Sequence, residues 1–325
     1  MQSTENSRSE SSAPVALVRS DIWYDDGNVI LQAEGVQFKV HKSILAQSSS
    51  VFQDMFSFPQ PSTTDTEMAE GCPIVHLSDS AEEVRYVLQA IFQRKYTVGE
   101  VLSLPVVSAL LCLGGKYDIQ PLHNEARKRL FLLFTITLHE RDAITWASAG
   151  IEDPEDRGFF FHALLTARRA GLLSILPLLL YPCCGFFKAS EIKNGFRSGM
   201  DGSTLYFPRD DQIACLAGYQ AIYAAQAETT YAWLYQDSTL GPNCITPQTC
   251  DEARRVHLIT YSTAPTPDIA GLRTWSAETE LLDDELCKNK LHEAGREKFW
   301  EQLPGLFDLP SWEELSKERD DLYVF

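Results

Sequence analysis

The sequence predicts an α+β fold for residues 15–135, with a small sheet packed against helices, followed by a mainly α-helical region over 136–325. Apolar and polar residues alternate over 29–33 and again over 36–40, on either side of Glu34-Gly35, a pattern typical of a β-hairpin. From Ile44 to Phe56 the apolar spacing becomes helical, and helical spacing then dominates the second part of the chain.

The elements between these landmarks follow from local signals. The serines at 48–50 predict a turn and a helix N-cap, and the polar stretch 57–72, rich in Pro, Ser and Thr, predicts a loop. A short strand over 73–77 precedes a helix whose capping box pairs Ser80 with Glu83. Two more helices are expected, one from Ser103 to Gly114-Gly115 and one over 121–133.

The second part of the chain has the pattern of successive helices. Helices are expected over 139–149 and 157–170, and Gly150 and Gly171 predict where they end. A long helix is expected over 211–235, and further helices over 251–261 and 278–303. The long helix carries one stripe at helical spacing, made of Ile213, Leu216, Ala217, Gln220, Tyr223, Ala224 and Ala227. The polar, Ser-rich residues 1–14 are expected to form a disordered tail.

Charge and hydropathy limit the classes of partner. The 45 acidic and 28 basic side chains give a net charge of −17, which repels nucleic acid and anionic lipid, so we expect neither as a partner. The densest basic run, Arg127-Lys128-Arg129, is expected to lie on a solvated helix face. The N-terminus lacks a signal-peptide core, and the longest apolar run, 172–181, is too short to span a bilayer. The sequence therefore indicates an intracellular protein, cytoplasmic or nuclear.

Catalytic and metal-binding motifs are sparse. The sequence has no nucleophile elbow, no phosphate-binding glycine loop and no zinc-protease helix motif, so we expect no catalytic residue and no cofactor. The eight cysteines are expected to be mostly buried thiols. A zinc site built from Cys244, Cys250 and His257 remains an alternative, although these residues do not form two close ligand pairs.

An ordered series of short motifs covers residues 20–134. As a set, it resembles the BTB/POZ domain. The matching positions are Asp21-Ile22, His41-Lys42, Ile44-Leu45, Ser48 or Ser49, Phe52 with Met55-Phe56, and the helix that ends in Lys116-Tyr117. The whole chain is similar to an expanded fungal group of BTB proteins, which carry a helical C-terminal half. This likeness rests on Met55-Phe56 with Pro59 and Pro61, Gly71-Cys72-Pro73, His76-Leu77-Ser78-Asp79 and Cys183-Cys184.

This resemblance implies a non-enzymatic protein–protein interaction module. Domains of this family often form symmetric dimers through the first helix and neighbouring strands, which here correspond to residues around Val40 to Phe56, with Phe52 and Met55 among the contacts. Asp21 and Lys42 match a charged pair found at the family's dimer groove. This pair can bind a ligand or simply hold the hairpin to the helix. Lys42 stands where Arg is commoner in the family, and lysine cannot form the bidentate hydrogen bonds of a guanidinium.

A more specific role rests on the loop after the Phe-x-x-Met-Phe helix. Met68-Ala69-Glu70 fits the hydrophobic-x-Glu pattern of cullin-binding adaptors, which implies a ubiquitin-ligase substrate adaptor. Two alternatives remain open: a transcription-associated BTB oligomerisation factor, and an enzyme or zinc-binding protein with its site in the C-terminal half.

Overall fold

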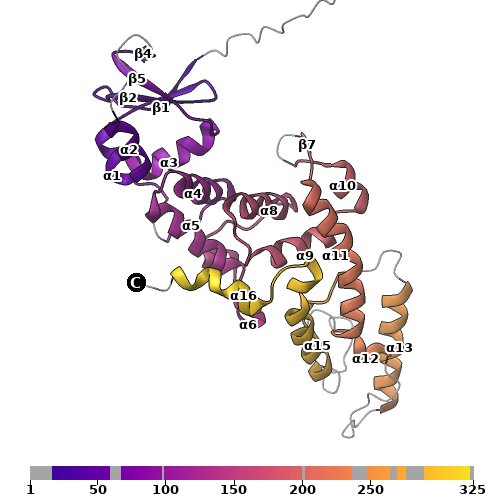
Figure 1. Cartoon of the computed structure of the whole chain (residues 1–325). Coiled ribbons are helices and arrows are strands. Elements are labelled where there is room, and N and C mark those ends of the chain that lie inside the picture. The colour runs from indigo at the N-terminus through magenta and orange to yellow at the C-terminus, as the bar shows by residue number, and fades with distance from the viewer. Residues whose placement is uncertain are drawn as a thin grey trace, which may run out of the picture. The chain divides into compact units, whose positions relative to one another are not determined.

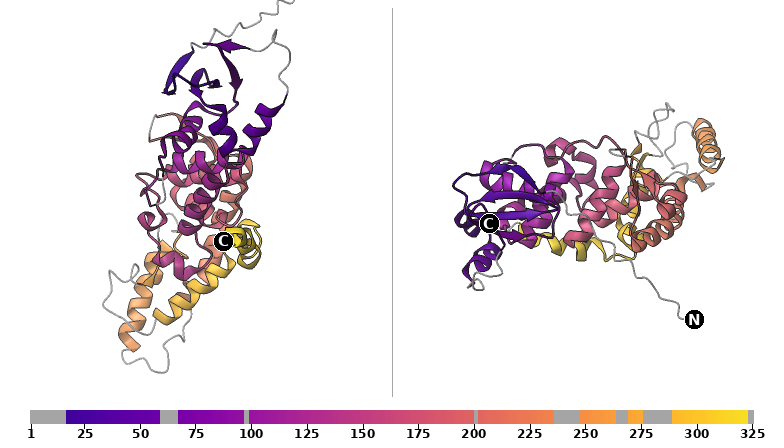
Figure 2. Two further views of the ribbon diagram at one scale, coloured as in Figure 1. Left: turned by 90° about the vertical axis from the view of Figure 1, so that its left-hand side faces the viewer. Right: turned by 90° about the horizontal axis from the view of Figure 1, so that it is seen from above.

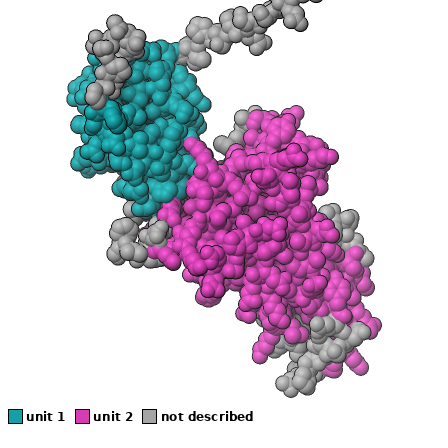
Figure 3. All heavy atoms as spheres, viewed as in Figure 1, with its two compact units in different colours: residues 1–100, 105–125 teal, residues 101–104, 126–325 magenta. Residues whose placement is uncertain are grey.

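The computed structural model describes residues 17–58, 67–96, 99–199, 202–235, 247–263, 269–275 and 289–322. The chain divides into two units: unit 1 comprises residues 1–100 and 105–125, and unit 2 comprises 101–104 and 126–325 (Figure 3). The division falls inside helix α5 (Gln120–Leu133), ahead of the boundary expected after residue 135. The tail expected at residues 1–14 lies outside the described residues.

A five-stranded mixed sheet forms the top of unit 1 in Figure 1, in the order β1-β3-β2-β5-β4. The predicted hairpin is present, because β2 and β3 pair antiparallel around Glu34 and Gly35, whose φ angles of 46° and 80° suit a tight type I′ turn. β1 pairs parallel with β3, and β5 pairs parallel with β2. The strands are β1 (Val18–Trp23), β2 (Val29–Ala33), β3 (Val36–Val40), β4 (Met68–Ala69) and β5 (Cys72–His76).

Helices of unit 1 begin where the sequence places their caps. The Ser49 hydroxyl accepts a hydrogen bond from the Phe52 backbone N–H, and Ser80 accepts one from Glu83. The helices are α1 (Lys42–Ser48), α2 (Ser50–Ser57), α3 (Ala81–Gln93), α4 (Leu104–Lys116) and the first turns of α5. Their apolar faces and the sheet enclose a core that includes Ile22, Leu31, Phe38, Leu45, Val84, Leu88 and Leu110.

Two local expectations for unit 1 are wrong. Helix α4 does not stop at Gly114-Gly115 but continues to Lys116. A side chain at position 114 would meet the backbone nitrogen of His123 at 2.9 Å, so the glycine serves close packing of α5 rather than helix termination. The segment predicted as a loop over 57–72 also contains strand β4, which pairs with β5.

Unit 2 is mainly helical, so the α+β fold with a helical second part is confirmed. Helices α8 and α9 pack together, and α9, α15 and η1 pack against α11 (Figures 1 and 2). The elements are α6 (Leu138–Ala143), α7 (Trp146–Ala149), α8 (Gly158–Ala170), α9 (Leu176–Phe186), α10 (Ala189–Asn194), β6 (Phe196–Arg197), β7 (Thr204–Leu205), α11 (Arg209–Glu228), α12 (Ala232–Tyr235), α13 (Pro247–Thr263), α15 (Asn289–Gln302), η1 (Pro304–Phe307), α16 (Trp312–Ser316) and η2 (Lys317–Leu322).

Two of the helices expected in unit 2 are each broken into two separate helices. The helix expected over 139–149 is split into α6 and α7, because Thr145 leaves the helical conformation and caps α7. The helix expected over 211–235 ends at Glu228, and α12 is separate. Most of the stripe starting at Ile213 is exposed, while Cys215, Gly218 and Ile222 face the core. Of the helix expected over 278–303, α15 is described, and 278–288 lies outside the described residues.

Candidate functional site

Asp21 lies on β1 of unit 1 and pairs with a cation that the sequence did not single out. Its carboxylate is 2.8 Å from Nη1 of Arg85, which belongs to α3. Lys42 instead places its Nζ 5.7 Å from the centre of the Phe56 ring, and its backbone N–H donates to Asn28. The structure therefore pairs Asp21 with Arg85 and not with Lys42, while a role of Asp21 and Lys42 in binding a partner stays a prediction.

Phe52 is a core residue and not a contact surface. Its side chain is 3% exposed, and its ring stacks on Tyr117 with centroids 4.9 Å apart. Burial excludes direct contact between Phe52 and a partner in the folded unit, so its role is to hold α2 in place. Met55, from the same helix, is half-buried and reaches the surface.

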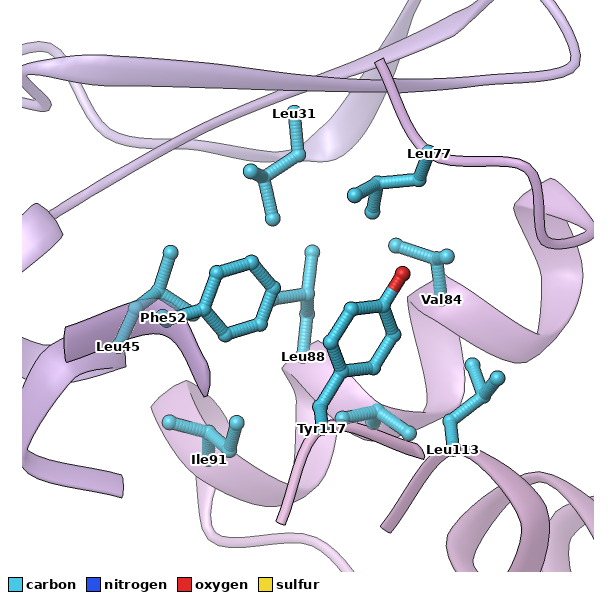
Figure 4. Close-up of a pocket in the computed structure, with 10 residues that line it drawn as sticks. Leu31, Leu45, Phe52, Leu77, Val84, Leu88, Ile91, Leu113 and Tyr117 are labelled. Atoms are coloured by element: carbon cyan, nitrogen blue, oxygen red, sulfur yellow. The ribbon is translucent and has the colours of Figure 1, made fainter. Parts of the chain in front are cut away.

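A small hollow lies between α2, α3, α4 and the sheet in unit 1. Figure 4 shows that Phe52, Leu88 and Tyr117 point into it, and its lining is apolar. It has room for about one water molecule, which is too little for a substrate or cofactor. We interpret it as a packing gap in the core.

A polar network at the edge of this core ties distant segments of unit 1 together. The Asp79 carboxylate, almost fully buried, receives hydrogen bonds from Lys116 Nζ at 2.7 Å and from the Tyr117 hydroxyl at 2.5 Å. The Ser49 hydroxyl donates to the Tyr117 carbonyl at 2.5 Å. Burial raises the pKa of Tyr117, and the hydrogen bond to Asp79 raises it further. This network has a structural role, since its donors and acceptors satisfy one another.

Exposed apolar side chains mark two regions of unit 1. Val18 on β1 is 56% exposed, its neighbour Leu17 is 57% exposed, and β1 is an edge strand of the sheet. On the helical side, Ile44 of α1 and Phe58 at the end of α2 are exposed. Exposed apolar residues on a strand edge and on a nearby helix pair are typical of surfaces that bind protein.

The Met68-Ala69-Glu70 segment, formed by strand β4 and the turn after it, presents one apolar and one charged side chain. Met68 on β4 is 56% exposed. Glu70 occupies the β4–β5 turn with φ of 49° and forms ion pairs with Arg19 and, at 3.8 Å, with Lys39. Met68 is therefore available to a partner, whereas Glu70 already has partners within unit 1.

The zinc alternative rests on residues that the structure describes only in part. Cys244 and the side chain of Cys250 lie outside the described residues, and the His257 ring packs edge-on against Trp233 at 6.0 Å. Among the described residues, no three His, Cys, Asp or Glu side chains come together in a way that could hold a metal ion. Burial raises the pKa of the Cys183 thiol, and contact with Cys215 raises that of Cys184.

Aromatic and basic residues of unit 2 that could serve as partner contacts are mostly used internally. Trp233, Trp275 and Trp300 are buried. In the run 127–129, Arg127 donates to the Glu318 carbonyl, and Arg129 is buried and donates to the Gly150 carbonyl. The expectation of a fully solvated basic face is therefore wrong. Within the described part of the chain, no helix has the length and apolar character needed to cross a bilayer.

Comparison with known proteins identifies the first unit. The family model of the BTB/POZ domain matches residues 25–130, which include the hairpin, α1 to α4 and most of α5. A search of curated proteins finds no match to the chain. The match covers most of the region in which the sequence motifs occur in order, although Asp21-Ile22 lies ahead of it, and unit 2 lies almost entirely beyond it.

Proposed function

We propose that this chain, whose residues 25–130 form a BTB/POZ domain, works by binding other proteins and itself, and not as an enzyme. The domain is a protein-interaction module, and unit 1 exposes apolar side chains in the manner of one. The observation that carries the proposal is the edge strand β1 with Leu17 and Val18 exposed. The free thiols Cys72, Cys183, Cys184 and Cys215 fit a reducing compartment, so we place this role in the cytoplasm or nucleus.

Self-association is the first part of the proposal. An edge strand offers unpaired backbone groups, and a two-fold axis beside β1 would let each copy cover the apolar side chains of the other. Ile44 and Met55, on the helices that follow the hairpin, are candidates for the same interface. We expect the full chain to be a homodimer at micromolar concentration.

Light scattering on full-length variants tests this part. Val18→Asp places a charge on β1 and should convert the dimer to a monomer. Met68→Asp is the matched control, because Met68 is equally exposed but lies on β4, which does not pair with β1, and it should leave the dimer intact. A wild-type monomer, or the same mass for both variants, would contradict self-association through β1.

Cullin binding is a second candidate, favoured by the exposure of Met68 in the segment that fits the adaptor pattern. A pull-down with purified cullin should lose signal with Met68→Ala and with Met68→Ala/Glu70→Ala. Arg19→Ala is the control: it removes one of the two ion pairs of Glu70 and leaves Met68 in place, so cullin capture should persist. Undiminished capture by the Met68 variants, or no capture by the wild type, would exclude Met68-Ala69-Glu70 as a cullin-binding motif. A dimer without cullin binding would favour the transcription-associated oligomerisation alternative.

A further inference from the structure

Unit 2 carries an aromatic surface that packing within the unit leaves partly open. It consists of Trp146, Phe159, Phe160 and Phe186, from α7, α8 and the end of α9. The rings form a connected set: Trp146 meets Phe159 edge-on at 4.9 Å, Phe159 meets Phe160 at 5.5 Å, and Phe160 meets Phe186 at 5.4 Å. Phe186 is 51% exposed, and the other three rings are half-buried.

An acidic loop leads directly into this surface. Glu152, Asp153, Glu155 and Asp156 are all exposed and immediately precede α8, whose first turn contributes Phe159 and Phe160. Four exposed carboxylates that lead directly into the helix of Phe159 and Phe160 create a negative potential at the start of α8. A ligand that matches both this potential and the aromatic surface needs positive charge on a partly apolar side chain.

Two basic residues that adjoin this surface in the sequence, Arg157 and Lys188, do not cancel the charge of the acidic loop. Arg157 follows the acidic loop, but both its terminal nitrogens bind the Glu191 carboxylate, at 2.9 and 2.6 Å, and Nη1 also donates to the Phe186 carbonyl. Its guanidinium lies 4.8 Å from the centre of the buried Phe187 ring. Lys188 is exposed and adds one positive charge against the four negative charges of the loop.

We infer that the aromatic surface binds an arginine- or lysine-rich segment of a protein partner, with basic side chains stacked on the Phe186 and Trp146 rings and paired with the acidic loop. Cations are attracted to the faces of aromatic rings, and Arg stacks on them more often than Lys. The net charge of −17 would speed the approach of such a partner. This site lies in unit 2 and is independent of the self-association proposed for β1.

Binding of a short peptide of alternating Arg and Gly to the full chain, measured by fluorescence anisotropy, tests the inference. The comparison peptide replaces each Arg with citrulline, which keeps the shape and removes the charge. We expect the Arg peptide to bind at least about tenfold more tightly than the citrulline peptide. Equal affinity for the two peptides would overturn the inference.

Variants distinguish binding at this aromatic surface from nonspecific electrostatic attraction of the peptide to an acidic protein. Phe186→Ala should weaken binding about tenfold, and Phe186→Tyr should restore it because the ring face is kept. Tyr235→Ala is the matched control, since Tyr235 is 50% exposed elsewhere in unit 2, and it should bind as the wild type does. Equal effects of Phe186→Ala and Tyr235→Ala, or no rescue by Phe186→Tyr, would overturn the site.

The contribution of the acidic loop to binding is tested by neutralising three carboxylates in the loop and, as a control, three carboxylates elsewhere in unit 2. Glu152→Gln/Asp153→Asn/Glu155→Gln should weaken binding at low salt, and the difference should shrink as salt rises. Asp156 is left intact because its carboxylate accepts a hydrogen bond from the Gly158 backbone N–H at 2.6 Å. The control, Glu301→Gln/Glu313→Gln/Glu314→Gln, removes three exposed carboxylates of unit 2 and should have a clearly smaller effect. Equal weakening by both triples would contradict the assignment.

Discussion

The guanidinium of Arg319 lies against the end of helix α5, where its Nη2 donates a 2.6 Å hydrogen bond to the carbonyl oxygen of Phe134. Nη1 donates to the Phe131 carbonyl at 3.0 Å, and the guanidinium also lies over the Phe131 ring. The neighbouring Glu318 carboxylate accepts the backbone N–H groups of Leu173 and Ser174. The segment η2 is thereby joined to two other parts of unit 2, and a cation is placed where the α5 dipole favours one.

Replacing Arg319 should destabilise unit 2. Arg319→Ala leaves the carbonyls of Phe131 and Phe134 without their donor in a buried site, at a cost of about 3 kcal/mol. Arg319→Lys should recover only part of the lost stability, because the ammonium group of lysine cannot reach several acceptors as the planar guanidinium of arginine does. Urea unfolding, monitored by circular dichroism, measures the free energy of unfolding of both variants. Lys317→Ala, which breaks an exposed pair with Glu314, should change stability by less than about 0.5 kcal/mol.

The Asp79 network in unit 1 gives a second prediction. Asp79→Ala removes the acceptor for Lys116 and Tyr117 and should cost about 2–3 kcal/mol, because the Tyr117 hydroxyl is left buried without its partner. Tyr117→Phe keeps the ring stacked on Phe52 and should cost about 1 kcal/mol. The double variant should lose less stability than the sum of the losses in the two single variants, since both substitutions remove the same hydrogen bond. Additive costs in thermal melts would show that the two residues are not coupled.

Local features of unit 1 were predictable from sequence because their causes are local. The hairpin followed from alternation around Glu34-Gly35, and the starts of α2 and α3 followed from Ser49 and Ser80, whose hydroxyls bind backbone N–H groups three residues ahead. The motif series also identified the BTB/POZ domain that the family model matches. Each of these signals is contained within a short stretch of chain.

The contacts of the candidate surfaces were not predictable, because they depend on which distant segments meet. Asp21 pairs with Arg85 rather than Lys42, and no local pattern selects between those two cations. The position of Phe52 in a helical apolar pattern did not reveal whether it faces the core or a partner. For α11, both sides carry small or apolar residues, so spacing alone could not tell that Ile213 is exposed while Cys215 is buried.

Gly295 in α15 gives a third prediction, based on close packing. A Cβ at this position would lie 2.7 Å from the Cα of Thr230, so the helix approaches the α11–α12 connection too closely for any side chain. Gly295→Ala should therefore destabilise unit 2 by about 2 kcal/mol, although alanine favours helix. Gly305→Ala is the control, because nothing lies within 4 Å of the corresponding Cβ. An equal or higher melting temperature for Gly295→Ala would show that α15 packs less closely than described.

The ion pair between Glu191 and Arg157 gives a prediction about pH. Hydrogen bonds from Arg157 lower the pKa of Glu191 to about 2, against an ordinary value of 4.5. Because the folded pKa is below the unfolded one, the unfolded chain binds the proton more readily, so the pair stabilises unit 2 above about pH 4.5 and this stabilisation is lost as the pH falls towards 2.

Glu191→Gln should thus lower stability most at neutral pH. Since both side chains are partly exposed, we expect a loss of about 1 kcal/mol at pH 7, which narrows as the pH falls from 5 to 3. Urea unfolding of wild type and variant across that range measures the narrowing. Glu314→Gln, in an exposed pair with Lys317, should differ from wild type by less than about 0.5 kcal/mol throughout. A wild-type advantage over Glu191→Gln that stays constant or grows towards acid would contradict the low pKa of Glu191.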